Sequence, residues 1–140
     1  MHPWLFYSLL ATLFAGLTAV LAKFGLRHVP SDLAMTVRTT VVFALIWLNA
    51  LLLGQPRQLA QLTRADILWL SGSGLATGLS WIYYYRAVQQ GPVGLVASID
   101  KGSVVITILL SWLVLGEPLT PKLALGGALI VAGLVVLAWK

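Results

Sequence analysis

The sequence contains no cysteine, only four acidic residues and few charges of either sign. Without cysteine, the chain can form no disulfide and has no thiolate for metal binding or nucleophilic attack. Charged residues make up 9% of its 140 residues. Soluble domains carry about a quarter, so this chain has too little polar surface to cover a globule in water.

The missing motifs exclude further classes of function. The four acids lie far apart in the sequence and no His-x-x-x-His pair is present, so we expect no metal site and no cofactor. The sequence also lacks a G-x-S-x-G motif and a Walker loop, so we do not expect an enzyme. The net charge is +5, but the basic residues form no polybasic run, which argues against nucleic-acid binding.

Long apolar runs take up most of the chain. Two runs of nineteen residues, Trp4 to Ala22 and Ile67 to Tyr85, and one of seventeen, Leu123 to Trp139, carry no charge. Two further runs, 33–53 and 93–115, are interrupted by one and two charged residues. A membrane-spanning helix needs about 20 mostly apolar residues, so the sequence predicts five spans. We therefore expect an all-α integral membrane protein, a five-transmembrane-helix bundle forming a single domain over residues 1–140. The expected spans are about 4–26, 33–53, 66–87, 93–115 and 121–139.

The short links between the runs carry helix-start signals. Ser31 or Asp32 is placed to cap the second helix. Thr63 and Asp66 have the spacing of a capping box for the third helix. Thr120, followed by proline, is placed to cap the last helix.

Five spans put the two termini on opposite faces of the bundle, and we name the N-terminal side face X and the other face Y. Lys23 and Arg86 fall at the ends of the first and third spans at face Y, and Arg38 falls one turn inside the second. Lys23 and Arg86 can act as interface anchors, with Tyr83, Tyr84 and Tyr85 as an aromatic belt, or they can contact a substrate. The same two roles are open for Arg38.

Asp100 and Lys101 lie deeper than the other charges. They are about 10–13 Å into the fourth span from its start, near the middle of a core about 30 Å thick. A charge at that depth costs at least about 2.5–3.5 kcal/mol, so it should face a partner or a wet cavity. Asp100, Ser103, Thr107 and Ser111 have the spacing of one helix face, which suggests a polar pathway. The alternatives are a structural ion pair of Asp100 with Arg38 or Arg86, and hydroxyls that bond their own helix.

Other residues complete the predicted polar cavity. Four cations would make the cavity electropositive: Lys23, Arg38, Arg86 and Lys101. This favours an anionic or zwitterionic solute, with Asp100 as the carboxylate that contacts substrate or carries a coupling proton. Trp81 and Tyr84 are candidates for flat walls of the cavity or for core packing. Glu117, in a Gly-Glu-Pro corner on face X, is a candidate structural cap or gate element.

The third and fourth spans carry a recognisable pattern. The segment GLSWIYYYRAVQQGPVGLVASIDKGSVVITILLSWLVLGEPLTPKLALGGALIVAG, residues 78–133, resembles the EamA-type domain of the drug/metabolite transporter superfamily. LTAVLAKFGLRHV at 17–29 and TVRTT at 36–40 agree with the first half of that domain. The resemblance covers essentially the whole chain. The chain is similar to the short, five-span bacterial and archaeal group of this family. Full-length members usually carry two tandem inverted domains with ten spans, and often a proline in span 4 where this chain has Asp100 and Lys101.

The resemblance implies a small secondary transporter of the inner membrane for a polar metabolite or drug-like solute. A lone five-span unit can rebuild an inverted repeat by pairing with an oppositely inserted copy. Basic residues at the two faces are nearly balanced, so the positive-inside rule does not fix one orientation. They are Arg57, Arg64 and Lys122 at face X, and Arg27, Lys140, Lys23 and Arg86 at face Y.

We therefore expect an antiparallel, dual-topology homodimer, with a non-identical sister chain as the second possibility. The expected partners are the lipid bilayer and a small-molecule substrate. A non-transporting subunit of a larger transporter or flippase is the alternative function. A channel is less favoured, because the X half offers only hydroxyls.

Overall fold

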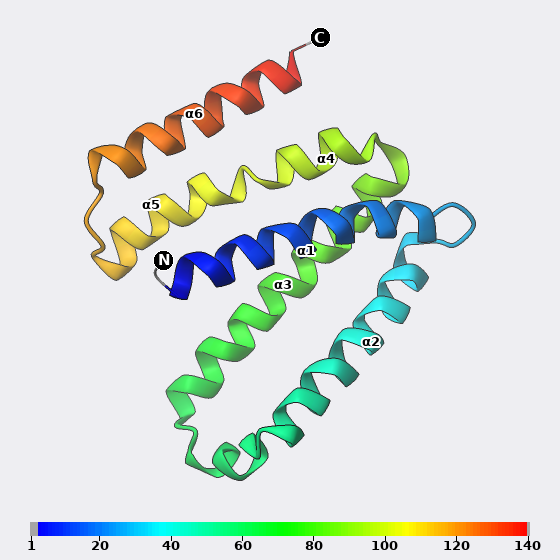
Figure 1. The fold of residues 1–140 in the computed structure, drawn as a ribbon, viewed down its shortest axis with the longest axis vertical. Helices are drawn as coiled ribbons and strands as arrows, with labels where there is room; N and C mark the ends of the chain where they lie inside the picture. Colours follow the sequence, from blue (N-terminus) through cyan, green and yellow to red (C-terminus); the bar gives the residue numbers. More distant parts are fainter. Residues whose placement is uncertain (1–2, 140) are drawn as a thin grey trace. The chain divides into compact units, whose positions relative to one another are not determined.

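A computed structural model describes residues 3–139, so residues 1, 2 and 140 of the predicted domain, including Lys140, lie outside the described part. The described chain is all-α and contains no strand (Figure 1). Its elements are α1 (Pro3–Gly25), α2 (Ser31–Leu52), the 3₁₀ helix η1 (Gln55–Gln61), α3 (Arg64–Gln90), α4 (Val93–Asp100), α5 (Ser103–Leu115) and α6 (Pro121–Ala138).

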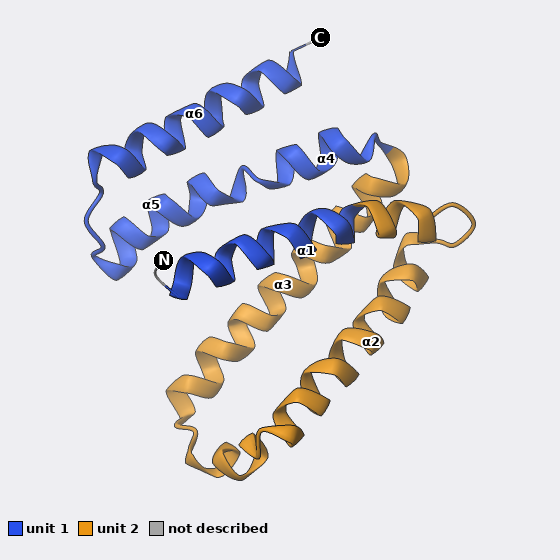
Figure 2. Cartoon of the chain, viewed as in Figure 1, with its two compact units in different colours: residues 1–19, 91–140 blue, residues 20–90 orange. Residues whose placement is uncertain are grey.

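The chain divides into two compact units (Figure 2). The first unit holds residues 1–19 and 91–140, and the second holds residues 20–90. The boundary at residue 19 falls inside α1, so this helix contributes its N-terminal part to the first unit and its C-terminal part to the second. Each unit is described separately below.

Within residues 3–139, four helical segments are long and apolar enough to cross a membrane: Pro3–Gly25, Ser31–Leu52, Val93–Leu115 and Pro121–Ala138. Almost none of their residues are buried in the protein, as expected where lipid covers the side chains. The third predicted span, 66–87, corresponds to α3, which has 27 residues but is not among the four. The Ser-Gly-Ser-Gly sequence at 71–74 reduces its apolar character.

In the first unit, the predicted fourth span is not one regular helix. α4 ends at Asp100, and a turn at Lys101 and Gly102 precedes α5. In this turn the Lys101, Gly102, Val104 and Val105 amides bond the carbonyl three residues back instead of four, at 2.9–3.1 Å. Such 3₁₀ bonds tighten the helix locally. Asp100 therefore ends one helical segment, and Ser103 begins the next.

α5 and α6 form an antiparallel hairpin with regular end caps (Figure 1). Gly116 follows α5 in the left-handed conformation, φ 68°, and the Glu117 amide bonds the Ser111 carbonyl at 3.2 Å. This bond, from residue 117 back to residue 111, satisfies one of the carbonyls that have no partner within the helix at the end of α5. Thr120 caps α6 as predicted, because its hydroxyl accepts the Leu123 amide at 3.3 Å.

In the second unit, α2 and α3 pack side by side and η1 joins them (Figure 1). The predicted capping box is confirmed. The Thr63 hydroxyl donates to Asp66 Oδ2 at 2.7 Å, its amide donates to the same oxygen at 3.0 Å, and the Asp66 amide donates back at 3.2 Å. The expected cap of α2 by Ser31 or Asp32 is wrong, because the N-cap position is Pro30 and no side chain caps this helix.

Candidate functional site

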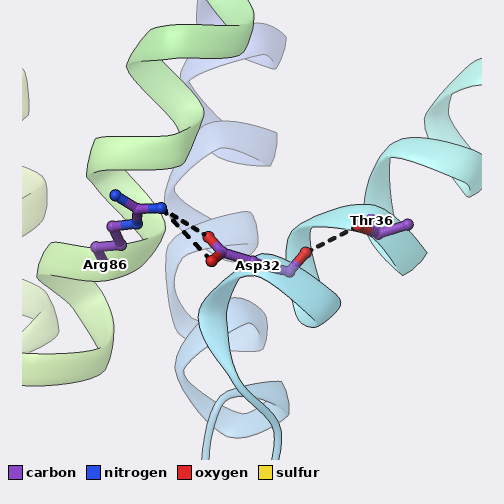
Figure 3. A network of polar contacts seen from close by, with 3 residues as sticks. All are labelled: Asp32, Thr36 and Arg86. Atoms are coloured by element: carbon purple, nitrogen blue, oxygen red, sulfur yellow. Dashed lines mark hydrogen bonds and ion pairs between the residues drawn. The ribbon is translucent and has the colours of Figure 1, made fainter.

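The charged and aromatic residues of the second unit gather where the start of α2 meets the end of α3. Arg86 of α3 places Nη2 at 3.4 Å from Oδ1 and 3.5 Å from Oδ2 of Asp32 on α2 (Figure 3). The Thr36 hydroxyl donates to the Asp32 backbone carbonyl at 2.9 Å, one turn further along α2. The side chains of Arg86 and Asp32 are 51% and 67% exposed. An ion pair this exposed contributes at most about 1 kcal/mol, so its main effect is to neutralise Arg86.

Asp32 thus has a different role from the cap predicted for it. It lies in the first turn of α2, where a negative charge interacts favourably with the helix dipole. Its carboxylate, however, faces an arginine 54 residues away in the sequence instead of the amides of its own helix. Sequence spacing gave no signal for this partner. From the sequence, Asp100 is a candidate ion-pair partner of Arg86, whereas the structure shows Asp32 as its carboxylate partner.

Arg38 differs from Arg86 in its surroundings. It is half-buried on α2, about 10 Å beyond the helix start, and its guanidinium carbon lies 4.4 Å from the Trp81 ring centroid and 5.5 Å from that of Tyr85. The acids of its own unit, Asp32 and Asp66, are bound to Arg86 and Thr63. Arg38 is therefore held by aromatic faces, an attraction of about 0.5–2 kcal/mol per ring, and no carboxylate of this unit neutralises it.

The aromatic residues around Arg38 are only partly those predicted. Trp81, a predicted wall, and Tyr85 are four residues apart on α3, so they share a helix face. Tyr84, the other predicted wall, is half-buried, and its ring meets that of Tyr85 at 6.3 Å and 62°. Tyr83 is exposed as an interface residue would be, whereas Tyr85 is buried and cannot belong to a lipid-facing belt. The spacing of Tyr85 from Trp81 was the signal that could have identified it.

Lys23 lies at the end of α1 and contacts the end of α3. Its ammonium donates to the Val88 carbonyl at 2.6 Å. Val88 is in the last turn of α3, where carbonyls have no partner within the helix, so the lysine satisfies one of them. The Gln89 side chain joins the same region by donating to the Val29 carbonyl at 3.3 Å. These bonds support a structural role for Lys23 beside the predicted role in substrate contact.

In the first unit, Asp100 and Lys101 form a pair between neighbouring residues. Lys101 Nζ lies 3.7 Å from Asp100 Oδ2, and the side chains are 59% and 37% exposed respectively. Both lie in the middle of the candidate span Val93–Leu115. An exposed pair at that depth meets either lipid, which is costly, or a further protein surface or water.

The polar residues around this pair also form local bonds. The Thr107 hydroxyl donates to the Ser103 carbonyl at 3.0 Å, and the Ser111 hydroxyl donates to the Ile108 carbonyl at 3.1 Å. These are the bonds within one helix considered as the alternative to a polar pathway, although the hydroxyl oxygens can still accept a hydrogen bond. Glu117, the predicted cap or gate element, is an exposed residue whose backbone amide completes the cap of α5. Among residues 3–139, no three His, Cys, Asp or Glu side chains gather in a way that could hold a metal ion.

This arrangement brings together Arg38 and Trp81, and separately Arg86 with Asp32 and Asp100 with Lys101. A guanidinium between aromatic faces can bind a planar anionic group through its remaining N–H donors.

Comparison with known proteins supplies the family. A model described as the EamA-like transporter family matches residues 2–139. A protein of Sinorhizobium sp named "Uncharacterized transporter in cobO 3'region" is 41% identical over 137 residues, covering 98% of this chain and 97% of that protein. No solved structure matches the chain. The matching family consists of multi-pass membrane transporters and not of enzymes. The chain belongs to the EamA-like transporter family.

Proposed function

We propose that this protein is a secondary transporter that moves a small anionic or zwitterionic solute across the inner membrane. The observation that carries the proposal is Arg38, a half-buried cation on a candidate span that rests on Trp81 and Tyr85 and has no carboxylate partner in its own unit. An ionisable residue within a span is costly and is a functional candidate by default. Its free N–H donors suit a carboxylate or phosphate group of the solute.

The roles of the other charged residues follow from their partners. Arg86 is neutralised by Asp32 and supports the α2–α3 contact, so we assign it a secondary part in binding. Asp100 is the proposed coupling group, with Lys101 beside it, because these charges lie at mid-span. Trp81 and Tyr84 are the proposed walls, and Glu117 the proposed gate or cap.

The test of binding uses purified protein in sealed vesicles. Uptake of a mixture of small carboxylates, phosphates, zwitterions and organic cations is followed by mass spectrometry. We expect anions or zwitterions to accumulate, and Arg38→Gln to reduce that uptake by roughly 10- to 150-fold, the loss of one charged hydrogen bond. Arg27→Gln is the matched control, because Arg27 is exposed in the turn after α1 and stacks on Phe24 at the end of that helix. Uptake of cations alone, or uptake unchanged by Arg38→Gln, would refute the proposal.

The proposed assembly is an antiparallel homodimer of single five-span domains. In it, α3 crosses the membrane in addition to the four candidate spans. It is supported by the balanced basic residues of the two faces and by the mid-span exposure of Asp100 and Lys101, which a second chain would cover. The absence of cysteine permits a direct test. A single cysteine at the exposed Gln58 of η1 should be labelled to about half by a membrane-impermeant thiol reagent in intact cells.

Labelling near zero or near completion would instead show one orientation. The second candidate function, a non-transporting subunit that pairs with an inverted sister chain, would then be favoured. Saturable uptake by the purified protein alone separates a transporter from such a subunit. Because the positive-inside bias is weak, the sequence allows both the antiparallel homodimer and the pairing with a sister chain, and the cysteine labelling distinguishes them.

A further inference from the structure

A groove within the second unit lies away from the charged residues described above. It has a volume of about 210 Å³, far more than the roughly 10–15 Å³ needed to hold one water. It is lined by Ile46, Trp47, Ala50, Gln55, Pro56 and Leu59. All but one of these side chains are apolar, so the groove suits a hydrocarbon chain.

The groove is formed by the last turns of α2 and by η1. Ile46, Trp47 and Ala50 have the spacing of one helix face. Gly54 then turns the chain with φ 66°, and η1 begins at Gln55. Pro56 and Leu59 are three residues apart and therefore share one side of the 3₁₀ helix. The two apolar faces contact each other across the groove.

The position of the groove indicates which apolar molecule is available to fill it. α2 is a candidate membrane span, and the groove lies at the end where this span meets η1. Trp47 in its wall is of the residue type enriched at the membrane interface. At such a depth, the abundant hydrocarbon is the upper part of a lipid acyl chain.

The charge beside the groove selects among lipids. From residue 33 to residue 65 every charged side chain is an arginine: Arg38, Arg57 and Arg64. Arg57 of η1 follows Pro56 of the groove directly, Arg64 begins α3, and both arginines are exposed. The next acid, Asp66, is bound by Thr63. We propose that this groove binds an acyl chain of an anionic phospholipid, whose headgroup phosphate pairs with Arg57 and Arg64.

The experiment uses the full-length protein in bilayer discs of equal phosphatidylglycerol and phosphatidylcholine with identical acyl chains. Native mass spectrometry then counts the lipids retained by each protein particle. We expect phosphatidylglycerol to be retained in preference, and Arg57→Gln to reduce that preference by about five-fold, the effect of one basic residue near an anionic surface. Arg27→Gln, in a different part of the second unit, should leave it unchanged.

A second variant tests the groove itself. Ala50→Trp fills it and should abolish the retained lipid, whereas Ala44→Trp, an exposed alanine of α2 outside the lining, should not. Equal retention of the two lipids by the wild type would overturn the proposal, as would retention unaffected by Ala50→Trp. If Ala50→Trp changes the number of chains in the particle while lipid retention persists, the groove holds a second copy and the lipid assignment fails.

Discussion

Gly102 gives the prediction that the geometry constrains most closely. A Cβ added at this residue would lie 3.0 Å from the Ile99 backbone oxygen and 3.0 Å from Leu134 Cδ1. The Leu134 methyl can move by side-chain rotation, but the Ile99 oxygen accepts the Gly102 amide at 2.9 Å and belongs to the same tight turn. Gly102→Ala therefore requires these neighbours to give by a few tenths of an ångström, and the Ile99 oxygen can do so only if the turn between α4 and α5 moves.

The magnitude follows from overpacking of a tight site, about 1–3 kcal/mol of lost stability. Gly133→Ala on α6 is the matched control, since nothing lies within 4 Å of a Cβ at that position. Within a helix, this change should add about 0.5–1 kcal/mol, because alanine is the better helix former. The two alanine variants should thus differ by about 1.5–4 kcal/mol, with the wild type between them.

The assay is thermal unfolding in detergent, followed by the helical circular dichroism signal. At about 4 °C per kcal/mol, the melting temperatures of the two variants should differ by roughly 6–16 °C. Adding Leu134→Ala to Gly102→Ala relieves only one of the two close contacts, so it should restore no more than part of the loss. A Gly102→Ala variant as stable as Gly133→Ala would refute the close approach at this turn.

Three further predictions concern the charged residues. Thr63→Ala should raise the pKa of Asp66 toward its usual 3.8, because the Thr63 hydroxyl and amide hold that pKa down, and NMR titration would detect the change. Since the folded pKa is lowered, this contribution to stability is present above about pH 4 and is lost as pH falls through the folded pKa; a melting temperature equally acid-sensitive in Thr63→Ala would contradict it. A double-mutant cycle of Arg86→Gln with Asp32→Asn should give a coupling of about 1 kcal/mol or less, and a value above about 2 kcal/mol would show a desolvated pair. Asp100→Asn should abolish pH-driven uptake in vesicles and leave membrane insertion intact, so unchanged transport would remove Asp100 from the mechanism.

The helices and two of the three predicted caps were predictable because their determinants are local. Four of the five long apolar runs each produced one helix, the run 93–115 produced α4 and α5, and Thr63, Asp66 and Thr120 act on amides at most three residues away. Signals of this kind are contained in the sequence of a single link. The family resemblance, read from the third and fourth runs, is also confirmed over residues 2–139.

The tertiary partners were less accessible to sequence reasoning. The Asp32–Arg86 pair joins residues 54 positions apart, and Asp32 had an adequate local role as a cap that the fold does not use. The break after Asp100 involves the approach of Leu134 to Gly102 from another helix, which no periodicity in 93–115 reveals. The aromatic contacts of Arg38 were half predicted, because Trp81 was identified as a wall and Tyr85 was assigned to the interface.

At Gly54 and Gly116, the backbone conformation restricts which residue can replace glycine, whereas the space around the position does not. They are the positive-φ residues of the described chain, at 66° and 68°, and each follows the end of a helix. Nothing lies within 4 Å of a Cβ at either position, so space does not exclude a Cβ there. What these positions resist is the L-configuration, and asparagine, which tolerates that region, should replace them better than the smaller alanine. A mutational scan would therefore distinguish two kinds of glycine here: Gly102, where side-chain size decides, and this pair, where chirality does.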